Sequence, residues 1–220
     1  MVKGSRHDEG RGTQALPALC DGDLFERFLS GENGAYTVLY HRYSARVNGF
    51  IRSLLGGGNL AADDVFQETF LRLFRERNRL QQQREEGLEI EPLRNVGGWL
   101  FRVARNLSLN QIRSEGYLTD LPEGTSERLV TTTAEAFPEM FGTHLAEERL
   151  LQQVYAAVDR LPVTLREVFV LREVNGMSYE ETAEIVGCSM EAARMRLSRA
   201  RKVIREALIP TPERIDRPDN

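Results

Sequence analysis

The sequence predicts an all-α protein made of two small helical domains joined by a flexible linker, the C-terminal one a helix-turn-helix. Apolar residues recur every three or four positions over most of the chain, which is typical of amphipathic helices. Sustained apolar–polar alternation, the mark of strands, is absent, and β-branched residues cluster only at 130–133. Residues 116–142 are rich in Gly, Pro, Ser, Thr and acids without helical spacing, which indicates a linker.

The length of the chain fits two domains, each with its own core. It has 220 residues, of which 41% are hydrophobic and 28% charged, as in an ordinary globular protein. No window approaches the run of about 20 apolar residues that crosses a bilayer, so we expect no membrane insertion. Residues 1–21 lack the apolar core of a signal peptide, which predicts a disordered leader on a cytoplasmic protein. The proline-rich tail at 210–220 is expected to fray.

The first domain is expected at 22–115. Apolar spacing predicts four helices in it, over 24–29, 36–54, 65–74 and 99–107. Glycines at 31 and 56–58 are suited to end the first two helices, and Asp63 and Asp64 favour the positive end of the third helix dipole. The polar stretch 79–98 is expected to extend the third helix and then to form a loop near Pro92.

The second domain, at 143–209, carries the strongest local signal. Ser178 and Glu181 have the spacing of a capping box that starts a helix. Gly187 suits the left-handed position at that helix's end, and Ser189 can cap the next helix. A short helix, a glycine-containing turn and a longer helix form the plan of a helix-turn-helix.

The second helix of this motif separates a core face from a basic face. The residues expected to face the core are Ala193, Leu197, Ala200, Ile204 and Leu208. A stripe of Arg194, Ser198, Arg201 and Arg205 occupies another face. Because arginine can hold guanine O6 and N7 together, Arg194 and Arg196 are predicted at or beside the bases. Arg199, Arg201 and Lys202 are predicted at phosphates, which position the helix without reading sequence.

Basic residues gather in two strips although the formal net charge is −4. Six basic residues and one acid lie between 191 and 205, and three arginines and no acid lie between 99 and 113. This distribution predicts two separate DNA contacts. In the second strip, Trp99, Arg102, Asn106, Asn110 and Arg113 recur at helical spacing, a face suited to hold phosphates and stack bases of a single strand. The loop at 114–120 is placed to form a pocket for a base turned out of the stack.

Several runs of residues stand in a specific order. In the C-terminal block they are Leu161-Pro162, Arg166–Glu173, Gly176–Glu181 and Arg196–Arg201; in the first block they are Asp63–Phe74 and Trp99–Asn106. The C-terminal runs closely resemble the promoter −35-reading domain of extracytoplasmic-function (ECF) sigma factors of the sigma-70 family. The first-block runs resemble that family's helix for the polymerase clamp helices and its helix for the −10 element. Met195 departs from the family, which often has a small residue there, and this affects the expected promoter preference.

The resemblance implies a sigma factor that binds core RNA polymerase and directs promoter-specific transcription initiation. Its other implied partners are promoter DNA and an anti-sigma factor, with no cofactor. The residues expected at the −35 duplex are Ser189, Glu191, Arg194, Arg196, Ser198, Arg199, Arg201 and Lys202. Those expected at the melted −10 strand are Trp99, Arg102, Arg105, Asn106, Asn110 and Arg113. Those expected at polymerase are Asp63, Asp64, Gln67, Glu68, Phe70 and Leu71.

The same residues leave other interpretations open. A free-standing helix-turn-helix regulator explains the C-terminal block but gives the helices at 63–74 and 99–107 no task. An enzyme would need a nucleophile–base pair, a phosphate loop or a metal cluster, and the two scattered cysteines and three histidines suggest none, so we expect neither catalytic nor metal-binding residues. A helical protein that only sequesters regulators would not need arginines on both DNA helices. Trp99 and the apolar residues near Phe70 are equally suited to a core.

Overall fold

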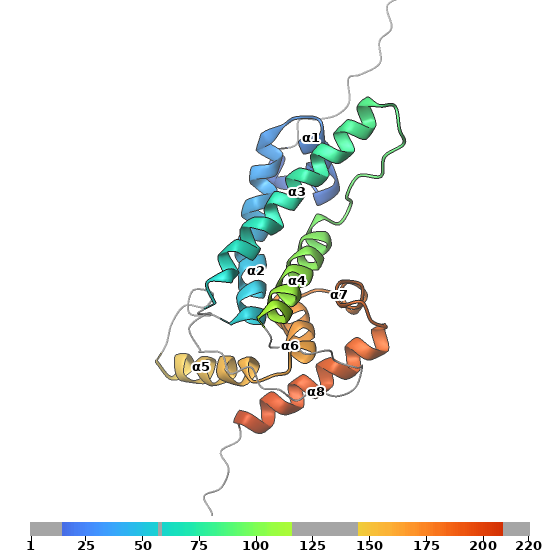
Figure 1. Cartoon of the computed structure of the whole chain (residues 1–220). Coiled ribbons are helices and arrows are strands. Elements are labelled where there is room, and N and C mark those ends of the chain that lie inside the picture. Colours follow the sequence, from blue (N-terminus) through green and yellow to red (C-terminus); the bar gives the residue numbers. More distant parts are fainter. Residues whose placement is uncertain (1–14, 57–58, 116–144, 209–220) are drawn as a thin grey trace, which may run out of the picture.

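The computed structural model describes residues 15–56, 59–115 and 145–208, which form helices and connecting turns with no strand among them. Figure 1 shows two groups of helices, one above the other. The N-terminal helices are η1 (Leu16–Ala18), α1 (Asp21–Leu29), α2 (Asn33–Leu55), α3 (Ala61–Glu85) and α4 (Val96–Ser114). The C-terminal helices are α5 (Leu145–Asp159), α6 (Val163–Phe169), the π-helical η3 (Val170–Val174), α7 (Tyr179–Val186) and α8 (Met190–Leu208). None of the described helices combines the length and apolarity that a membrane span requires.

Helix α2 is the centre of the N-terminal group, because α1, α3 and α4 all pack against it. Its fully buried residues include Leu39, Val47 and Phe50, and Phe50 meets Phe101 of α4 edge to face, with ring centroids 5.4 Å apart. The predicted glycine stop is confirmed, since α2 ends at Leu55 and is followed by Gly56, which has φ 94°. The predicted extension of the third helix is also confirmed, because α3 continues to Glu85 before the loop at 86–95.

Helix α4 approaches α2 closely at Gly97. A Cβ atom at that position would lie 2.7 Å from the Tyr43 ring, so only glycine fits there without displacing the ring. The Tyr43 hydroxyl donates to Asp21, and the Gly97 N–H donates to the same carboxylate at 3.3 Å. Arg42 adds a third donor to Asp21 at 2.5 Å. The Asp21 carboxylate therefore ties α1, α2 and the start of α4 together.

The helix-turn-helix forms as its local signals predict. The Ser178 hydroxyl accepts the Glu181 N–H at 3.1 Å, and the Glu181 carboxylate accepts the Ser178 N–H at 2.8 Å, which completes the capping box. Gly187 ends α7 in the left-handed region at φ 70°. Ser189 then accepts the Ala192 N–H at 3.1 Å and caps α8. The turn between the two helices is thus set by side chains adjacent to it in sequence.

The two groups of helices pack on each other through α6 and α7. Helix α6 lies against α2, and α7 lies against α4 (Figure 1). The contacts between the two groups also include Arg46 of α2, whose Nη2 donates to the carbonyl of Asn175, the residue after η3, at 2.6 Å. The helix-turn-helix is therefore held against the helix that carries the second basic strip.

Candidate nucleic-acid interface

Helix α8 places its apolar residues inward and its basic residues outward. Ala193, Leu197, Ala200 and Ile204 are buried, as predicted, and Leu208 is partly buried. The outward side carries exposed polar and charged residues, namely Glu191, Arg194, Ser198, Arg199, Arg201, Lys202 and Arg205. The apolar face fixes the rotation of the helix, and so the packing of α8 determines which arginines are available to a ligand.

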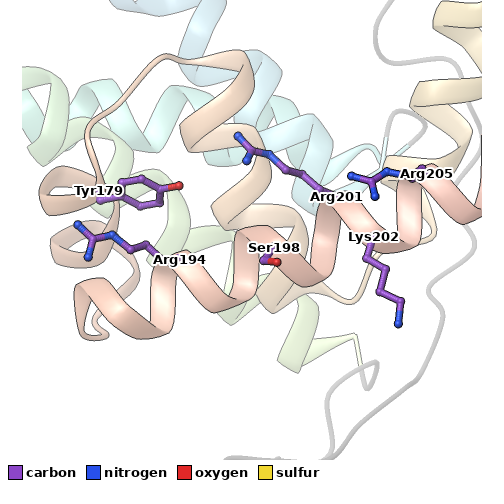
Figure 2. Close-up of a pocket in the computed structure, with 6 residues that line it drawn as sticks. All are labelled: Tyr179, Arg194, Ser198, Arg201, Lys202 and Arg205. Carbon is purple, nitrogen blue, oxygen red and sulfur yellow. The ribbon is translucent and has the colours of Figure 1, made fainter.

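A groove of about 410 Å³ runs along this basic face (Figure 2). It is lined by Tyr179, Arg194, Ser198, Arg201, Lys202 and Arg205. Four of these belong to the residues expected at the −35 duplex. Arg205 belongs to the predicted stripe but not to that set, and Tyr179 was not expected. Its position at the start of the first helix of a helix-turn-helix, the helix that crosses the DNA backbone, is the signal that identifies it.

Tyr179 holds two arginines at one end of the groove. The guanidinium carbon of Arg172 lies 4.2 Å from the centroid of the Tyr179 ring, and that of Arg194 lies 5.2 Å from it. Cation–π contacts of this kind attract the guanidinium to the ring and restrict its rotamers. Farther along the groove, Arg201 donates to Glu173 at 2.6 Å. Arg201 must exchange this carboxylate for any other anion that it binds.

The remaining residues expected at the −35 duplex lie outside the groove lining. Arg196 points the other way, toward the buried Glu167, and the distance from its Nη1 to Glu167 Oε1 is 3.8 Å. Ser189 is engaged in capping α8, and Glu191 and Arg199 are exposed beside the groove. Of the two arginines predicted at or beside the bases, the groove therefore contains Arg194 and not Arg196.

The residues of α4 that are expected at the −10 strand divide into an exposed and a covered set. Asn106, Asn110 and Arg113 are exposed, and Arg113 donates to the Asn110 side chain at 3.4 Å. Trp99 is partly buried and packs against the core. Arg102 and Arg105 face the C-terminal helices, where Arg102 pairs with Glu184 of α7. The predicted pocket loop lies outside the described residues from position 116 on.

Glu167 of α6 meets Arg105 in a two-pronged pair. Arg105 Nε and Nη2 donate to its two carboxylate oxygens at 2.6 and 3.2 Å, and Glu167 is only 1% exposed. Burial raises the pKa of the Glu167 carboxyl, and the hydrogen bonds and charge of Arg105, with the charge of Arg196, offset part of that rise. A buried ion pair of this kind gains Coulomb energy but also loses hydration, so its net contribution to stability is small.

The residues expected at polymerase, apart from Phe70, lie on one side of the first half of α3. Asp63, Asp64, Gln67 and Leu71 are exposed, and Leu71 is a large apolar residue with half of its surface in solvent. Glu68 accepts from Arg72 at 3.0 Å and from Arg75 at 2.7 Å, and these hydrogen bonds lower the pKa of its carboxyl. Phe70 is 4% exposed, and its ring centroid lies 5.0 Å from that of Tyr40. In this structure it is a core residue beneath the face.

Two protein-family models match the chain, one in each group of helices. Residues 39–117 match sigma-70 region 2, and residues 151–204 match sigma-70 region 4. The chain is 31% identical to the RNA polymerase sigma factor CarQ of Myxococcus xanthus, over 83% of this chain and 94% of CarQ. It is 28% identical to the ECF RNA polymerase sigma-E factor of Haemophilus influenzae, over 87% of this chain and 97% of that factor.

Solved structures show the same arrangement of helices. The structure of CnrH in complex with the cytosolic domain of CnrY matches with a TM-score of 0.59 and 25% identity, over 86% of this chain and 96% of that chain. RpoE of Bartonella quintana, solved with the anti-sigma factor NepR, has the same fold, with a TM-score of 0.55 and 23% identity over 83% of this chain and 98% of that one. With both regions present in order and a basic groove on the region 4 helix-turn-helix, the chain belongs to the ECF sigma factors of the sigma-70 family.

Proposed function

We propose that this sigma factor reads the −35 duplex with the groove on α8 and captures the melted −10 strand with the exposed face of α4. The observation that carries the first part is the groove itself, where four basic side chains and Ser198 line the outer face of the second helix of a helix-turn-helix. Such a helix enters the major groove with its N-terminal residues at the bases. Arg194 is the groove residue nearest that end, and it is assigned to a base contact.

The other basic residues of the groove are assigned to the DNA backbone. Arg201, Lys202 and Arg205 lie toward the C-terminal end of α8, away from the end that meets the bases. Phosphate contacts fix the orientation of a protein on the duplex but do not read its sequence. Tyr179 belongs with them, because it stacks on Arg194 and stands at the start of the helix that crosses the backbone.

The −10 assignment rests on exposed side chains of α4 that can bind unpaired bases. Asn106 and Asn110 offer amides to base edges, and Arg113 offers a guanidinium that can stack or hold a phosphate. Arg102 and Arg105 would join them once freed from Glu184 and Glu167. Trp99 stays in the proposed set because the residue is only partly buried. Residues 22–115 and 143–209 are thus proposed as two DNA-reading domains, on either side of a linker at 116–142.

Polymerase binding is assigned to the exposed side of α3. Asp63, Asp64, Gln67 and Leu71 combine acidic and amide groups with one exposed leucine, a mixture suited to a protein interface. Glu68 joins this side through its salt bridges, and Phe70 supports it from beneath. An anti-sigma factor is a proposed further partner, because NepR, the partner of the Bartonella quintana protein, is an anti-sigma factor. We place the protein in the cytoplasm, where its polymerase and promoter partners are.

The decisive experiment is run-off transcription by core polymerase, with and without the full chain, on a library of randomised promoters. Protein-dependent initiation, with a changed −35 preference for Arg194→Ala, is the expected result. The matched control is Arg160→Ala, which removes an exposed arginine outside the groove. Tight duplex binding by the free chain, without any protein-dependent transcription, would instead support a free-standing regulator.

A further inference from the structure

The helix proposed to capture the −10 strand is partly covered by the chain's own region 4. Both Arg102 and Arg105 of α4 meet carboxylates there, Glu184 on α7 and Glu167 on α6. At a third point, Arg46 of α2 donates to Asn175, which follows η3. Each contact joins residues separated by 62 or more positions, so all three depend on how the two groups of helices are placed.

We propose that α6 and α7 form an internal cover over the −10 face of α4, so that the closed chain and the melted strand compete for Arg102 and Arg105. This inference rests on the function proposed above. The occupant of the arginine surface is region 4 of the same chain, and its acidic residues at that contact take the place that phosphates would otherwise have.

Competition follows from the geometry of the Arg105 pair. Both Nε and Nη2 of Arg105 donate to Glu167, and the Arg105 side chain is only 18% exposed. The same N–H groups cannot point at a phosphate while they point at a carboxylate. Arg196 of α8 also reaches toward Glu167, at 3.8 Å. One buried carboxylate therefore attracts an arginine from each of the two predicted DNA-binding sets.

The cover must also be able to open, and the nature of its contacts allows this. The Arg105–Glu167 pair gains attraction but keeps two charges out of water, so that its net contribution is small. The Arg102–Glu184 pair is partly exposed to solvent, at 43% for the Arg102 side chain and 65% for Glu184, and exposed pairs shift an equilibrium by no more than about fivefold. A ligand that binds only the open form, such as a single strand or polymerase, shifts this balance by its differential affinity.

The test measures closure directly in the full chain. Spin labels are placed on native Cys20, which is exposed, and on a cysteine introduced at the exposed Glu206, with Cys188 replaced by serine. One label then reports on each group of helices, and their distance distribution separates closed from open molecules. Glu184→Arg places a second cation against Arg102 and is expected to lengthen the distance, and Glu184→Ala is expected to do so less.

A charge exchange gives the specific control. Arg102→Glu combined with Glu184→Arg restores an ion pair and is expected to restore the short distance, although each single change opens the chain. Glu86→Arg makes the same charge change at the end of α3, away from the contact, and should leave the distance as in the unaltered chain. If Glu184→Arg and the exchange both leave the distance unchanged, this contact does not hold the domains closed.

Competition is then measured with a labelled single-stranded −10 oligonucleotide and no polymerase. Glu184→Ala is expected to bind it up to about fivefold more tightly than the unaltered chain, and Glu86→Ala equally to it. Equal affinities for all three proteins would overturn the cover. Run-off transcription by the unaltered chain distinguishes a failure of the cover from a failure of the proposed function. Protein-dependent initiation is expected whether or not region 4 covers α4.

Discussion

Arg166 Nη1 donates to the backbone carbonyl of Ser53 at 2.9 Å and so joins α6 to the end of α2 across 113 positions of sequence. The Arg166 side chain is completely buried, and it donates to the carbonyls of Asp159 and Leu161 as well. Burial lowers the pKa of its guanidinium, yet the group remains charged because arginine starts far above neutral pH. A single cation thus supplies hydrogen bonds to three carbonyl groups at the junction of the two domains.

Replacing Arg166 by methionine should destabilise the protein. Methionine fills much of the same volume but leaves three carbonyl groups without this donor, and the expected loss in the free energy of unfolding is about 2–4 kcal/mol. Urea unfolding followed by circular dichroism measures it. Arg160→Met, at an exposed position, should stay within about 0.5 kcal/mol of the unaltered chain. Equal midpoints for both variants would contradict the role of Arg166.

The Tyr43 phenol predicts a loss of stability in alkali. Burial and the hydrogen bond to Asp21 raise the pKa of Tyr43 well above the usual tyrosine value of about 10. The unfolded chain loses this proton near pH 10, while the folded chain keeps it. The contribution of Tyr43 to the free energy of unfolding is therefore fully present below pH 10 and falls as the pH rises above it. Tyr43→Phe should be less stable at pH 8 by about 1 kcal/mol and should decline less steeply above pH 10. Parallel curves from pH 8 to 11 would exclude this linkage.

The capping box at the start of α7 predicts coupled effects of two substitutions. Ser178→Ala and Glu181→Ala each remove half of a reciprocal cap and should each cost about 1 kcal/mol of unfolding free energy. Because each half supports the other, the double variant should cost less than the sum of the two single ones. Glu180→Ala, at the exposed position beside them, is the control. Additive losses in urea unfolding would show that the two halves act independently.

Met195 is predicted to contact a thymine methyl group. It is 57% exposed on α8 and directly follows Arg194, the residue assigned to a base. An apolar side chain in the major groove recognises the C5 methyl of thymine. Replacing each thymine of the selected −35 element by deoxyuridine removes only that methyl, and at one position it should weaken holoenzyme binding about fourfold. Met195→Ala should abolish that difference; an equal response of both proteins at every thymine would remove Met195 from base reading.

Replacing Arg205 is predicted to change the salt dependence of duplex binding without changing the sequence preference. It lies in the groove far from the N-terminal end of α8 and is assigned to a phosphate. Arg205→Ala should reduce the slope of log K against log salt for duplex binding by about 0.9, the value for one released counterion. The selected −35 sequence should stay the same, in contrast to Arg194→Ala. A changed preference with an unchanged slope would reverse the two assignments.

The sequence predicts most of the local structure, because its signals act over a few residues. The capping box of Ser178 and Glu181, the stop at Gly187 and the inward face of α8 all depend on neighbours three or four positions away, and all are confirmed. The continuation of α3 beyond position 79 is confirmed for the same reason.

The features that the sequence does not predict depend on residues brought together from distant positions. Helical spacing puts Arg196 near the basic stripe, but only the packing of α6 shows that Glu167 draws it away. Arg105 carries no local sign of its pair with Glu167, 62 positions later. Phe70 has the spacing of both a surface anchor and a core residue, and the position of the Tyr40 ring decides for the core in this structure.

The π-helical segment η3 continues directly from α6, and the Asn175 N–H reaches back five residues to the Val170 carbonyl at 2.9 Å. A π-turn contains one residue more than the α-helical turn that it replaces. If the same residues formed an ordinary α-helix instead, the extra residue would carry the chain beyond it about 100° further round the helix axis. Asn175 would then leave Arg46, and α7 would start in another direction. The π-helical turn therefore helps to set the direction in which α7 begins.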